Sequence, residues 1–340
     1  MIVIMKRLTY IFKRIFSMDY KNLFDTINQI HKENGISRIK LFFDIIYCGI
    51  KFGAGFNDYK LYRFYELSDD LRSTYLNRTN NNLIVRTLNN PEYYHIVDNK
   101  IEFNEKFSAY LKRDWLDLRK TSLEEFEAFC NKHEDMMIKP IDETGGVGVE
   151  KIYTKDFSSV KEMYDFIMNK KAYLVEEVVK QHHDISKLYP YSVNTYRILT
   201  IKTDDNVDVI FGYIRLGNNG SVVDNHHAGG MSTPIDLETG KILYPAVDLN
   251  LNLFDEHPMT HVKFVGYQLP YWNEAKEMVK EAAKLIPELR YNGWDVAISE
   301  DGPLLIEGNH LPGYDSMSLP GQNPSRVGML PVYRKYVKGI

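Results

Sequence analysis

The segment Gly293-Trp-Asp-Val-Ala-Ile-Ser-Glu-Asp-Gly-Pro-Leu-Leu-Ile-Glu-Gly-Asn309 carries the strongest fold signal in this 340-residue chain. Two runs with alternating apolar residues flank Glu300-Asp-Gly302, which is typical of a tight turn, so the segment predicts a β-hairpin. With the turn centred on its middle residue, Asp295 in the first strand lies directly opposite Glu307 in the second. Asn309 lies on the same face as Glu307, because side chains alternate along a strand.

The other side of this hairpin is apolar and is expected to face the core. The same register pairs Val296 with Ile306 and Ile298 with Leu304. This pairing requires an unbroken ladder, because a single β-bulge shifts every partner beyond it.

The two opposed acids indicate a metal site. Directly opposed strand residues have Cβ atoms about 4.5–5.5 Å apart, and like charges placed there repel each other. A divalent cation removes the repulsion, and the oxygen ligands of Asp295, Glu307 and Asn309 suit Mg²⁺ or Mn²⁺. The alternative is an exposed hairpin with two solvated acids. On either interpretation the acids lie on a solvent-facing surface, so replacing one should leave the fold intact.

A lysine and a glycine-rich loop occur upstream, in Met136-Met-Ile-Lys-Pro-Ile-Asp-Glu-Thr-Gly-Gly-Val-Gly-Val-Glu-Lys-Ile152. The pattern predicts a strand that ends at Lys139, a loop and a second strand. Gly145, Gly146 and Gly148 allow the loop to turn backbone N–H groups toward phosphate oxygens. The loop is neither a P-loop nor a dinucleotide fingerprint, because GxxxxGK[ST] is missing and no helix follows the glycines. A plain turn is the alternative.

Charged residues interrupt two further apolar strands. Glu176 and Glu177 lie in Tyr173-Leu-Val-Glu-Glu-Val-Val179 and, being adjacent, face opposite sides of the strand. Arg197 lies in Val193-Asn-Thr-Tyr-Arg-Ile-Leu-Thr200, where a buried guanidinium needs an anionic partner such as a phosphate or an acyl phosphate. The alternatives are a structural ion pair for the acids and a core salt bridge for the arginine.

The segment Asp224-Asn-His-His-Ala-Gly-Gly230 combines a carboxamide and two imidazoles with a pair of glycines. It is interpreted as a loop that binds an anion or a substrate, as a zinc site, or as a simple turn. Adjacent histidines do not easily share one ion, and no third ligand is near in the sequence, which disfavours zinc.

The order of the elements indicates an α+β fold with mostly antiparallel sheets. Residues 1–76 are expected to be helical apart from a turn at Gly53–Asp58, and the asparagine-rich stretch Asn77–Asn90 is expected to contain a connection. Residues 77–335 form the second predicted domain, with a lid at about 121–180 and a metal-binding sheet at about 190–320. We expect strands at 136–139, 147–153, 173–179, 193–202 and 207–216, and helices at 158–168 and 273–286.

A capping box marks one more helix within the predicted lid. Ser122-Leu-Glu-Glu125 predicts its start, because the serine and the glutamate can each accept a bond from the other's backbone N–H. Leu123, Phe126 and Phe129 are expected to form its buried stripe.

Composition and charge exclude several classes of protein. The net charge of −4 provides no domain-wide basic field for a nucleic acid. Cys48 and Cys130 have no metal-like spacing, and so few cysteines favour a reducing cytoplasm. No run approaches the roughly 20 apolar residues that span a bilayer.

The first 18 residues predict an amphipathic helix with a basic polar face. This helix either docks on its own protein or contacts an anionic surface at the inner face of the membrane. Its cations are Lys6, Arg7, Lys13 and Arg14, and its apolar stripe is Leu8, Ile11, Phe12, Ile15 and Phe16.

The order of these signals along the chain resembles the ATP-grasp superfamily, in which two α+β subdomains clasp ATP. The segment Glu307-Gly-Asn-His-Leu-Pro-Gly-Tyr-Asp-Ser-Met-Ser-Leu319 resembles the corresponding part of D-alanine–D-alanine ligases. Together with Asp58, Tyr62 and Arg72-x-x-Tyr-Leu in the N-terminal region, the whole chain is most similar to the sugar-transfer-associated ATP-grasp family, which is found with polysaccharide biosynthesis genes.

The resemblance implies a nucleotide site. Lys139 would contact the adenine side and the α-phosphate, and Lys100 would match an earlier phosphate-binding lysine, with Lys106 as a competitor for that role. The glycine loop would close over the β- and γ-phosphates, and Asp184 would meet the ribose. The adenine-edge hinge would consist of Glu176, Glu177 and Val179.

The resemblance also implies a transfer site. Arg197, Asn225 and His227 would act on the transferring phosphoryl group, while two Mg²⁺ ions would be held by Asp295, Glu307 and Asn309. The substrate would be met by His226, Gly229, Gly230 and Ser318. Many relatives carry a lysine or arginine where this chain has its two histidines, which changes the charge of that contact.

The implied activity is that of an ATP-dependent carboxylate–amine ligase, which forms an amide through an acyl phosphate. The implied substrates are an amino acid or amine and a small or lipid-linked sugar carboxylate, with glycosyltransferases as partners. Two alternatives remain: a kinase of a sugar hydroxyl, and a nucleotide-binding module that scaffolds glycosyltransferases.

Overall fold

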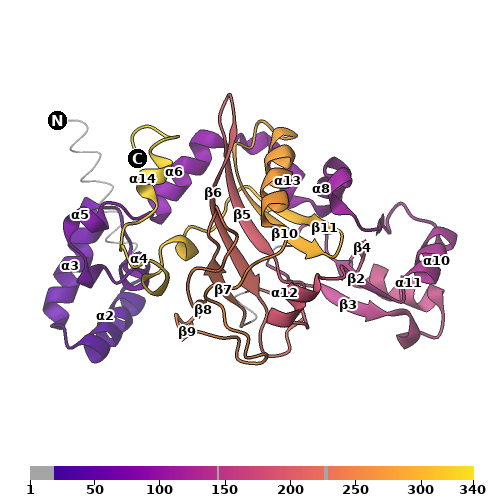
Figure 1. Ribbon diagram of the computed structural model, residues 1–340, viewed down its shortest axis with the longest axis horizontal. Helices are drawn as coiled ribbons and strands as arrows, with labels where there is room; N and C mark the ends of the chain where they lie inside the picture. Colours follow the sequence, from indigo (N-terminus) through magenta and orange to yellow (C-terminus); the bar gives the residue numbers. More distant parts are fainter. Residues whose placement is uncertain (1–18, 144, 226–228) are drawn as a thin grey trace. The chain divides into compact units, whose positions relative to one another are not determined.

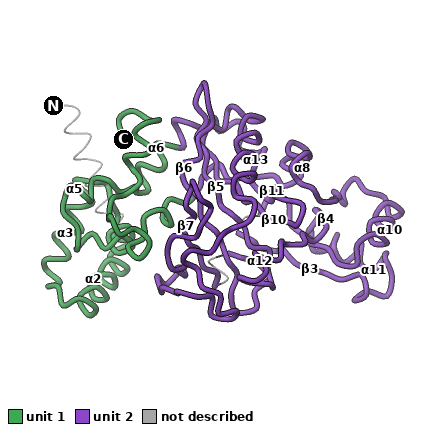
Figure 2. The backbone as a smooth tube through the Cα atoms, viewed as in Figure 1, with its two compact units in different colours: residues 1–84, 313–340 green, residues 85–312 purple. Residues whose placement is uncertain are grey.

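The computed structural model describes residues 19–143, 145–225 and 229–340, which fall into two units (Figure 2). Unit 1 comprises residues 1–84 and 313–340, and unit 2 comprises residues 85–312. The predicted helix Met1–Met18 and the predicted site residues His226 and His227 lie outside the described residues. None of the described helices is long and apolar enough to cross a lipid bilayer.

Unit 1 is helical, as expected, and its core is rich in aromatic rings such as Tyr59, Tyr62 and Phe64. Its elements are α2 (Tyr20–Asn34), α3 (Arg38–Lys51), α4 (Phe56–Leu61), α5 (Asp69–Arg72) and α14 (Leu330–Tyr333), with 3-10 turns η1 (Phe64–Glu66), η5 (Asp315–Met317) and η6 (Pro320–Gln322). Helix α6 (Arg78–Leu88) runs from unit 1 into unit 2.

Two expectations for this region need correction: the stretch Asn77–Asn90 does contain the junction of the two units, between Ile84 and Val85, but it is helical there. The asparagine-rich stretch forms helix α6, because the Asn77 side chain accepts hydrogen bonds from the backbone N–H groups of Thr79 and Asn80, at 2.9 and 3.0 Å, and so caps the helix. The predicted turn stops at Gly55, because α4 begins at Phe56.

A small sheet forms one part of unit 2. Among the described residues it has four antiparallel strands in the order β1-β4-β2-β3. Helices α10 (Leu123–Lys132) and α11 (Val160–Asn169) accompany it (Figure 1), and they share with it a core that includes Phe126, Ile138 and Ile167. The strands are β1 (Trp115–Asp117), β2 (Asp135–Lys139), β3 (Glu150–Tyr153) and β4 (Leu174–Glu177), and the 3-10 turn η3 (Thr154–Asp156) follows β3.

A larger sheet forms the rest of unit 2, with seven antiparallel strands among the described residues in the order β11-β10-β5-β6-β7-β8-β9. Helix α13 (Trp272–Lys284) packs on β5, β6, β10 and β11 (Figure 1). The strands are β5 (Tyr196–Lys202), β6 (Val207–Leu216), β7 (Met231–Pro234), β8 (Ala246–Asp248), β9 (Leu253–Phe254), β10 (Tyr291–Ser299) and β11 (Gly302–Asn309). The remaining elements among the described residues of this unit are four short helices and a 3-10 turn: η2 (Pro91–Tyr93), α7 (His95–Asp98), α8 (Lys100–Lys106), α9 (Ser108–Leu111) and α12 (His183–Leu188).

The α+β fold with antiparallel sheets is therefore confirmed. The predicted strands and helices are present with somewhat different ends, and the Ser122–Glu125 capping box opens α10. One buried position is wrong: Leu123 is exposed, whereas Phe126 and Phe129 are buried. Leu123 is the first residue of the helix, where the stripe has not yet turned onto the sheet.

The hairpin β10–β11 forms as predicted, but its ladder contains a bulge. Asp295 pairs with Glu307 as expected, and the register then shifts between Asp295 and Val296. Val296 pairs with Leu305 instead of Ile306, so the predicted apolar pairs are wrong. The bulge lets Val296 and Leu305 enter the main core together while the two acids remain opposed.

We predict that Leu289→Ala, in the core under α13, lowers the free energy of unfolding by about 2–5 kcal/mol, since it removes a fully buried side chain. Leu285→Ala is the matched control, because this neighbouring leucine is exposed and should cost less than about 0.5 kcal/mol. Urea denaturation followed by circular dichroism measures both. Equal losses would contradict the placement of the core.

Candidate functional site

The centre of the larger sheet holds a buried ion pair. Arg197 in β5 and Asp295 in β10 are direct cross-strand partners. Nη2 of Arg197 donates to Oδ2 of Asp295 at 2.9 Å, and its Nε donates to Oδ1, so the guanidinium binds the carboxylate with two hydrogen bonds. Gly293 makes room for this contact, because a Cβ there would lie 3.2 Å from Cδ of Arg197.

A second arginine extends this pair toward the loop that follows β6. Nη1 of Arg215 donates to Asp295 Oδ2 at 2.7 Å, and its Nη2 donates to Asp224 Oδ1 at 2.9 Å. The other Asp224 oxygen accepts from the backbone N–H and the hydroxyl of Thr195, at 3.0 and 2.5 Å. The start of the 224–230 loop is thereby held to the carboxylate of β10.

These contacts set the charges of the two opposed acids. Desolvation disfavours the charged form of Asp295, but Arg197 and Arg215 outweigh it and hold the pKa of Asp295 below its usual range. Desolvation and the negative charge of Asp295 raise the pKa of Glu307. The repulsion expected between the two acids therefore contributes to a raised pKa at Glu307 and not at Asp295. The Glu307 side chain is 46% exposed, and its Oε1 lies 3.9 Å from Nη2 of Arg197.

The two acids differ in burial, which corrects one expectation. Asp295 is only 3% exposed and is not on a solvent-facing surface. Replacing it would leave Arg197 and Arg215 without their shared counter-charge, so a change here is not neutral for the fold. For the half-exposed Glu307 the tolerated change stays a prediction.

The donor set fits a hard divalent cation. Asp295, Glu307 and the half-buried Asn309 offer only oxygen ligands, and Asn309 follows Glu307 by two residues in β11. Oδ1 of Asn309 accepts from the backbone N–H of Leu311 at 2.8 Å, which fixes the orientation of the amide. A carboxyl group whose pKa is raised by a negative neighbour is a group that a cation would stabilise in its charged form.

A second buried ion cluster surrounds Glu176 in β4. Its Oε1 accepts from Nη2 of Arg113 at 2.7 Å and from Nδ2 of Asn104 at 2.9 Å, and its Oε2 lies 2.5 Å from Nζ of Lys139. Desolvation opposes the charge, but Arg113 and Lys139 outweigh it and hold the pKa of Glu176 well below its usual range. The structural ion pair that the sequence left open is therefore present at Glu176.

The neighbouring Glu177 faces away, as strand alternation predicts. Its carboxylate accepts from the backbone N–H of Asp114 at 3.1 Å. Arg113 connects this region to the hairpin β10–β11, because its Nη1 donates to the carbonyl oxygen of Leu305 in β11 at 2.5 Å.

Lys100 lies between the two clusters. It is the first residue of α8, and its Nζ donates to the carbonyl oxygens of Ile141, at 3.4 Å, and Glu143. Desolvation lowers the pKa of Lys100, while the nearby charges of Glu307 and Lys139 act in opposite directions. The side chains of Lys100, Lys139 and Glu307 thus share one neighbourhood, whereas the competitor Lys106 is exposed at the end of α8.

The glycine loop contacts the 224–230 loop. Nδ2 of Asn225 donates to the carbonyl oxygen of Gly145 at 2.6 Å. Gly145, Gly146 and Gly148 all have positive φ, and a Cβ at Gly148 would lie 2.7 Å from Pro140. The structure therefore brings two predicted phosphate-binding loops together.

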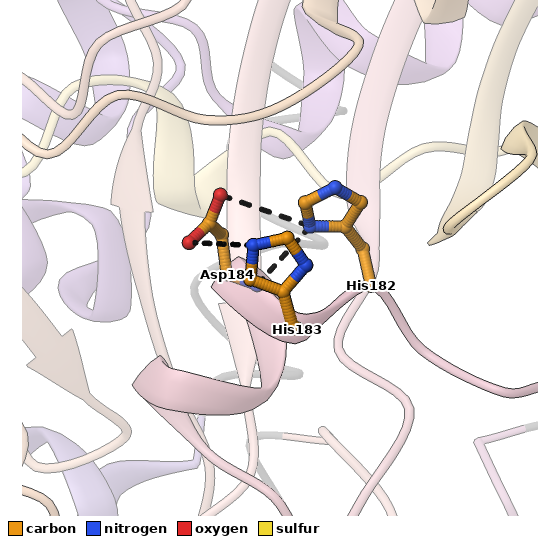
Figure 3. A group of neighbouring side chains, drawn as sticks. All are labelled: His182, His183 and Asp184. Atoms are coloured by element: carbon orange, nitrogen blue, oxygen red, sulfur yellow. Dashed lines mark hydrogen bonds and ion pairs between the residues drawn. The ribbon is translucent and has the colours of Figure 1, made fainter.

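Asp184 lies in the first turn of α12 beside His182 and His183 (Figure 3). Lys187 donates to its carboxylate at 2.7 Å and is the main cause of its lowered pKa. Nδ1 of His182 accepts from the backbone N–H of Asp184 at 3.1 Å and caps the helix, and the two imidazoles stack with their centroids 4.3 Å apart. Asp184 is thereby held as a charged, half-buried acceptor.

The remaining candidates are placed less informatively. Val179 follows β4 and is half-buried, and Gly229 is exposed with φ of +85°. Gly230 is buried, and a Cβ there would lie 2.6 Å from the carbonyl oxygen of Asp224. Ser318 is buried in unit 1, whereas the other described candidates belong to unit 2.

Sequence reasoning missed four residues of these clusters. Arg215 is an arginine within the apolar strand Val207–Leu216, so the argument used for Arg197 applies to it equally. No local pattern marks the other three, because their partners are distant in the sequence. They are Asn104, Arg113 and Asp224.

We predict that Glu176→Gln lowers the free energy of unfolding of unit 2 by about 3–5 kcal/mol at neutral pH, because Arg113 and Lys139 lose their buried counter-charge. Glu177→Gln is the matched control and should cost about 1 kcal/mol or less.

The cost of Glu176→Gln should also depend on pH. The depressed pKa makes the Glu176 contribution full above about pH 4.3, the usual pKa of an unfolded glutamate. The contribution is lost as the pH falls through the folded pKa, so the difference from the native protein narrows in acid. Urea denaturation at several pH values measures this, and equal costs for the two variants would contradict the ion cluster.

Comparisons with known proteins agree with this fold. The family model described as "Sugar-transfer associated ATP-grasp" matches residues 70–326, which is more than half of the chain. No curated protein sequence matches the chain.

Solved structures match at low identity. The ATP-grasp ligase PsnB, complexed with a minimal precursor, is 17% identical with a TM-score of 0.42, and the match covers 72% of this chain and 60% of that one. A PsnB complex with a phosphomimetic variant of the minimal precursor, Mg and ADP is 18% identical with a TM-score of 0.40, and the match covers 75% of this chain and 66% of that one. D-alanyl-alanine synthetase A from Vibrio cholerae is 14% identical with a TM-score of 0.39 and covers 72% and 61%.

The match therefore covers less than two thirds of the chain in each of these three structures. On the match to residues 70–326, the chain belongs to the sugar-transfer-associated ATP-grasp family.

Proposed function

We propose that this protein is an ATP-dependent carboxylate–amine ligase that forms an amide through an acyl phosphate. The observation that carries the proposal is the oxygen-donor set of Asp295, Glu307 and Asn309 with Arg197 beside it and Lys100 in its neighbourhood. This set joins a cation site to fixed positive charges, which is what phosphoryl transfer requires. Membership of the ATP-grasp family supports it.

ATP is the phosphoryl donor in this proposal, and two Mg²⁺ ions, for which Mn²⁺ can substitute, offset the charge of the transferred group. Asp295, Glu307 and Asn309 would hold the ions. Lys100 and Lys139 would bind phosphate oxygens, and the Gly145–Gly148 loop would close over them with backbone N–H groups. The contact between Asn225 and Gly145 supports a shared phosphate site for the two loops.

The nucleoside would lie near the end of β4. In this proposal Glu177 and Val179 supply the adenine edge, and Asp184 accepts hydrogen bonds from the ribose hydroxyls. The carboxylate of Asp184 is charged and half-buried, which suits that role. Glu176 would have a different role from Glu177, because its carboxylate contacts Lys139 and would orient that lysine instead of contacting the nucleoside.

The reaction would proceed in two steps. A carboxylate oxygen of the acid attacks the γ-phosphorus, and ADP leaves. The amine nitrogen then attacks the carbonyl carbon, inorganic phosphate leaves, and the nitrogen loses a proton. Arg197 and Asn225 would stabilise the transferring group, and no side-chain nucleophile is needed. The four-stranded sheet β1-β4-β2-β3, which includes strands of the predicted lid, would exclude water, which otherwise hydrolyses the acyl phosphate.

The substrates are proposed on the family description. A sugar carboxylate, free or lipid-linked, would be joined to an amino acid or amine during surface polysaccharide synthesis, with glycosyltransferases as partners. His226, His227, Gly229 and Gly230 would contact the acceptor, and Ser318 would bind a substrate carboxylate. Imidazoles in place of cations would make this contact weaker for a fully charged acceptor.

The test is phosphate release from ATP and Mg²⁺, measured with pools of uronic acids crossed with pools of amino acids. We expect release only where one acid and one amine are present together. Release with a sugar alone, with a stable phosphorylated product, would instead establish the kinase. ATP binding by calorimetry without release in any well, lipid-linked acids included, would favour the scaffold and overturn the ligase.

We further predict that Glu307→Gln lowers turnover roughly 100-fold or more, because a metal ligand supplies several kcal/mol of charge stabilisation. Its side chain is half exposed, so the melting temperature should stay near that of the native protein. Asp301→Asn, in the turn of the same hairpin, is the matched control and should keep full activity. Near-native turnover in Glu307→Gln would remove Glu307 from the metal site.

A further inference from the structure

Helix α3 is apolar on two faces, although only one of them is buried. Leu41, Ile45 and Cys48 pack into the core of unit 1. Ile39 and Phe43 follow each other at helical spacing on another face and are 72% and 67% exposed. An amphipathic surface helix normally presents polar residues there, so this second apolar face calls for an environment other than water.

The apolar surface continues onto α2. We call the exposed set on both helices the α2–α3 face: Tyr20, Phe24, Ile39, Phe43, Tyr47 and Ile50. Between the two helices this face contains a hollow of about 330 Å³, whose lining is almost entirely apolar and includes Phe24, Ile39 and Phe43. Six large apolar side chains thus gather within two consecutive helices.

The same part of the chain is basic in an otherwise acidic protein. Residues 1–51 contain nine lysines and arginines and four aspartates and glutamates, which gives a net charge of +5. Four of these cations lie in Met1–Met18, directly before α2, and residues 19–51 carry five cations and four acids. The whole chain carries −4, so residues 52–340 carry −9. Such an asymmetry points to an anionic partner for the N-terminal part. Three of its cations, Lys21, Arg38 and Lys40, are exposed on the two helices of the face.

We propose that the α2–α3 face docks on the surface of an anionic phospholipid bilayer. Its aromatic and aliphatic side chains enter the boundary between headgroups and acyl chains, and the surrounding cations contact lipid phosphates. A second copy of the chain fits less well, because two N-terminal parts of net charge +5 would be brought together. The segment Met1–Met18 carries four cations and no acid, and residues 19–51 offer no excess of acids to pair with them.

The first experiment is co-sedimentation of the full-length protein with vesicles of phosphatidylglycerol and phosphatidylcholine. We expect binding that falls with added salt and is weak to pure phosphatidylcholine. Ile39→Ser combined with Phe43→Ser should lower the partition coefficient roughly tenfold or more, because the inserted side chains are lost. Leu253→Ser with Val265→Ser is the matched control, as both residues are exposed in unit 2, and it should bind like the native protein.

A second variant places a reporter in the face without removing it. Phe43→Trp should show a blue-shifted emission with anionic vesicles and quenching by lipids brominated on their acyl chains. The native tryptophans, Trp115, Trp272 and Trp294, all lie in unit 2 and provide the baseline. This readout remains valid if the double serine variant folds poorly.

Three results would overturn the proposal. One is no difference between anionic and neutral vesicles. Another is unchanged binding of the Ile39 and Phe43 variant while Ile11→Ser with Phe12→Ser abolishes it, which would assign the contact to Met1–Met18 alone. The third is a dimer in sedimentation velocity that the Ile39 and Phe43 changes dissociate without any vesicle binding, which would make the face a contact between copies.

Discussion

The site depends on one interaction, the buried ion pairing of the Asp295 carboxylate with Arg197 and Arg215. It lies where β5, β6 and β10 run side by side, and its two arginines connect a sheet position to the loop that begins at Asp224. Because Asp295 is committed to these arginines, the charge conflict across the hairpin appears as a raised pKa at Glu307. A cation would stabilise the charged form of Glu307, which is why this pair of acids is proposed as part of a metal site.

The second ion cluster, around Glu176, likewise joins parts of unit 2 that are distant in the sequence. Glu176 is buried with Arg113 and Lys139, and Arg113 also donates to the backbone of Leu305 in the hairpin β10–β11. Buried ion pairs contribute little net stability, since desolvation offsets most of the Coulombic gain. Their role here is to hold Lys139 in place at the end of β2. Lys139 lies in the same neighbourhood as Lys100 and Glu307. The charged side chains of the proposed phosphate site are thereby held in position by contacts within the protein.

Much of this could be predicted from local sequence. Alternating apolar residues around Glu300–Gly302 correctly placed Asp295 opposite Glu307, and a lone arginine in an apolar strand correctly indicated a buried anionic partner. The bulge after Asp295 could not be predicted, because it satisfies packing between Val296 and Leu305 in the core rather than any local preference. Asparagine-rich composition does not indicate a helix such as α6, whose start depends on the cap that Asn77 provides.

The sequence by itself determined the type of fold, the antiparallel strands and the residue types of the site, since these follow from periodicity, turn chemistry and the oxygen ligands of one hairpin. Only the tertiary structure decided which charges pair: Arg215 with Asp224 and Asp295, and Arg113 with Glu176. Such partners are separated by many residues and meet through strand order, which local patterns do not encode. The burial of Asp295 and the exposure of Ile39 and Phe43 were decided there too, because accessibility is a property of neighbours and not of the residue alone.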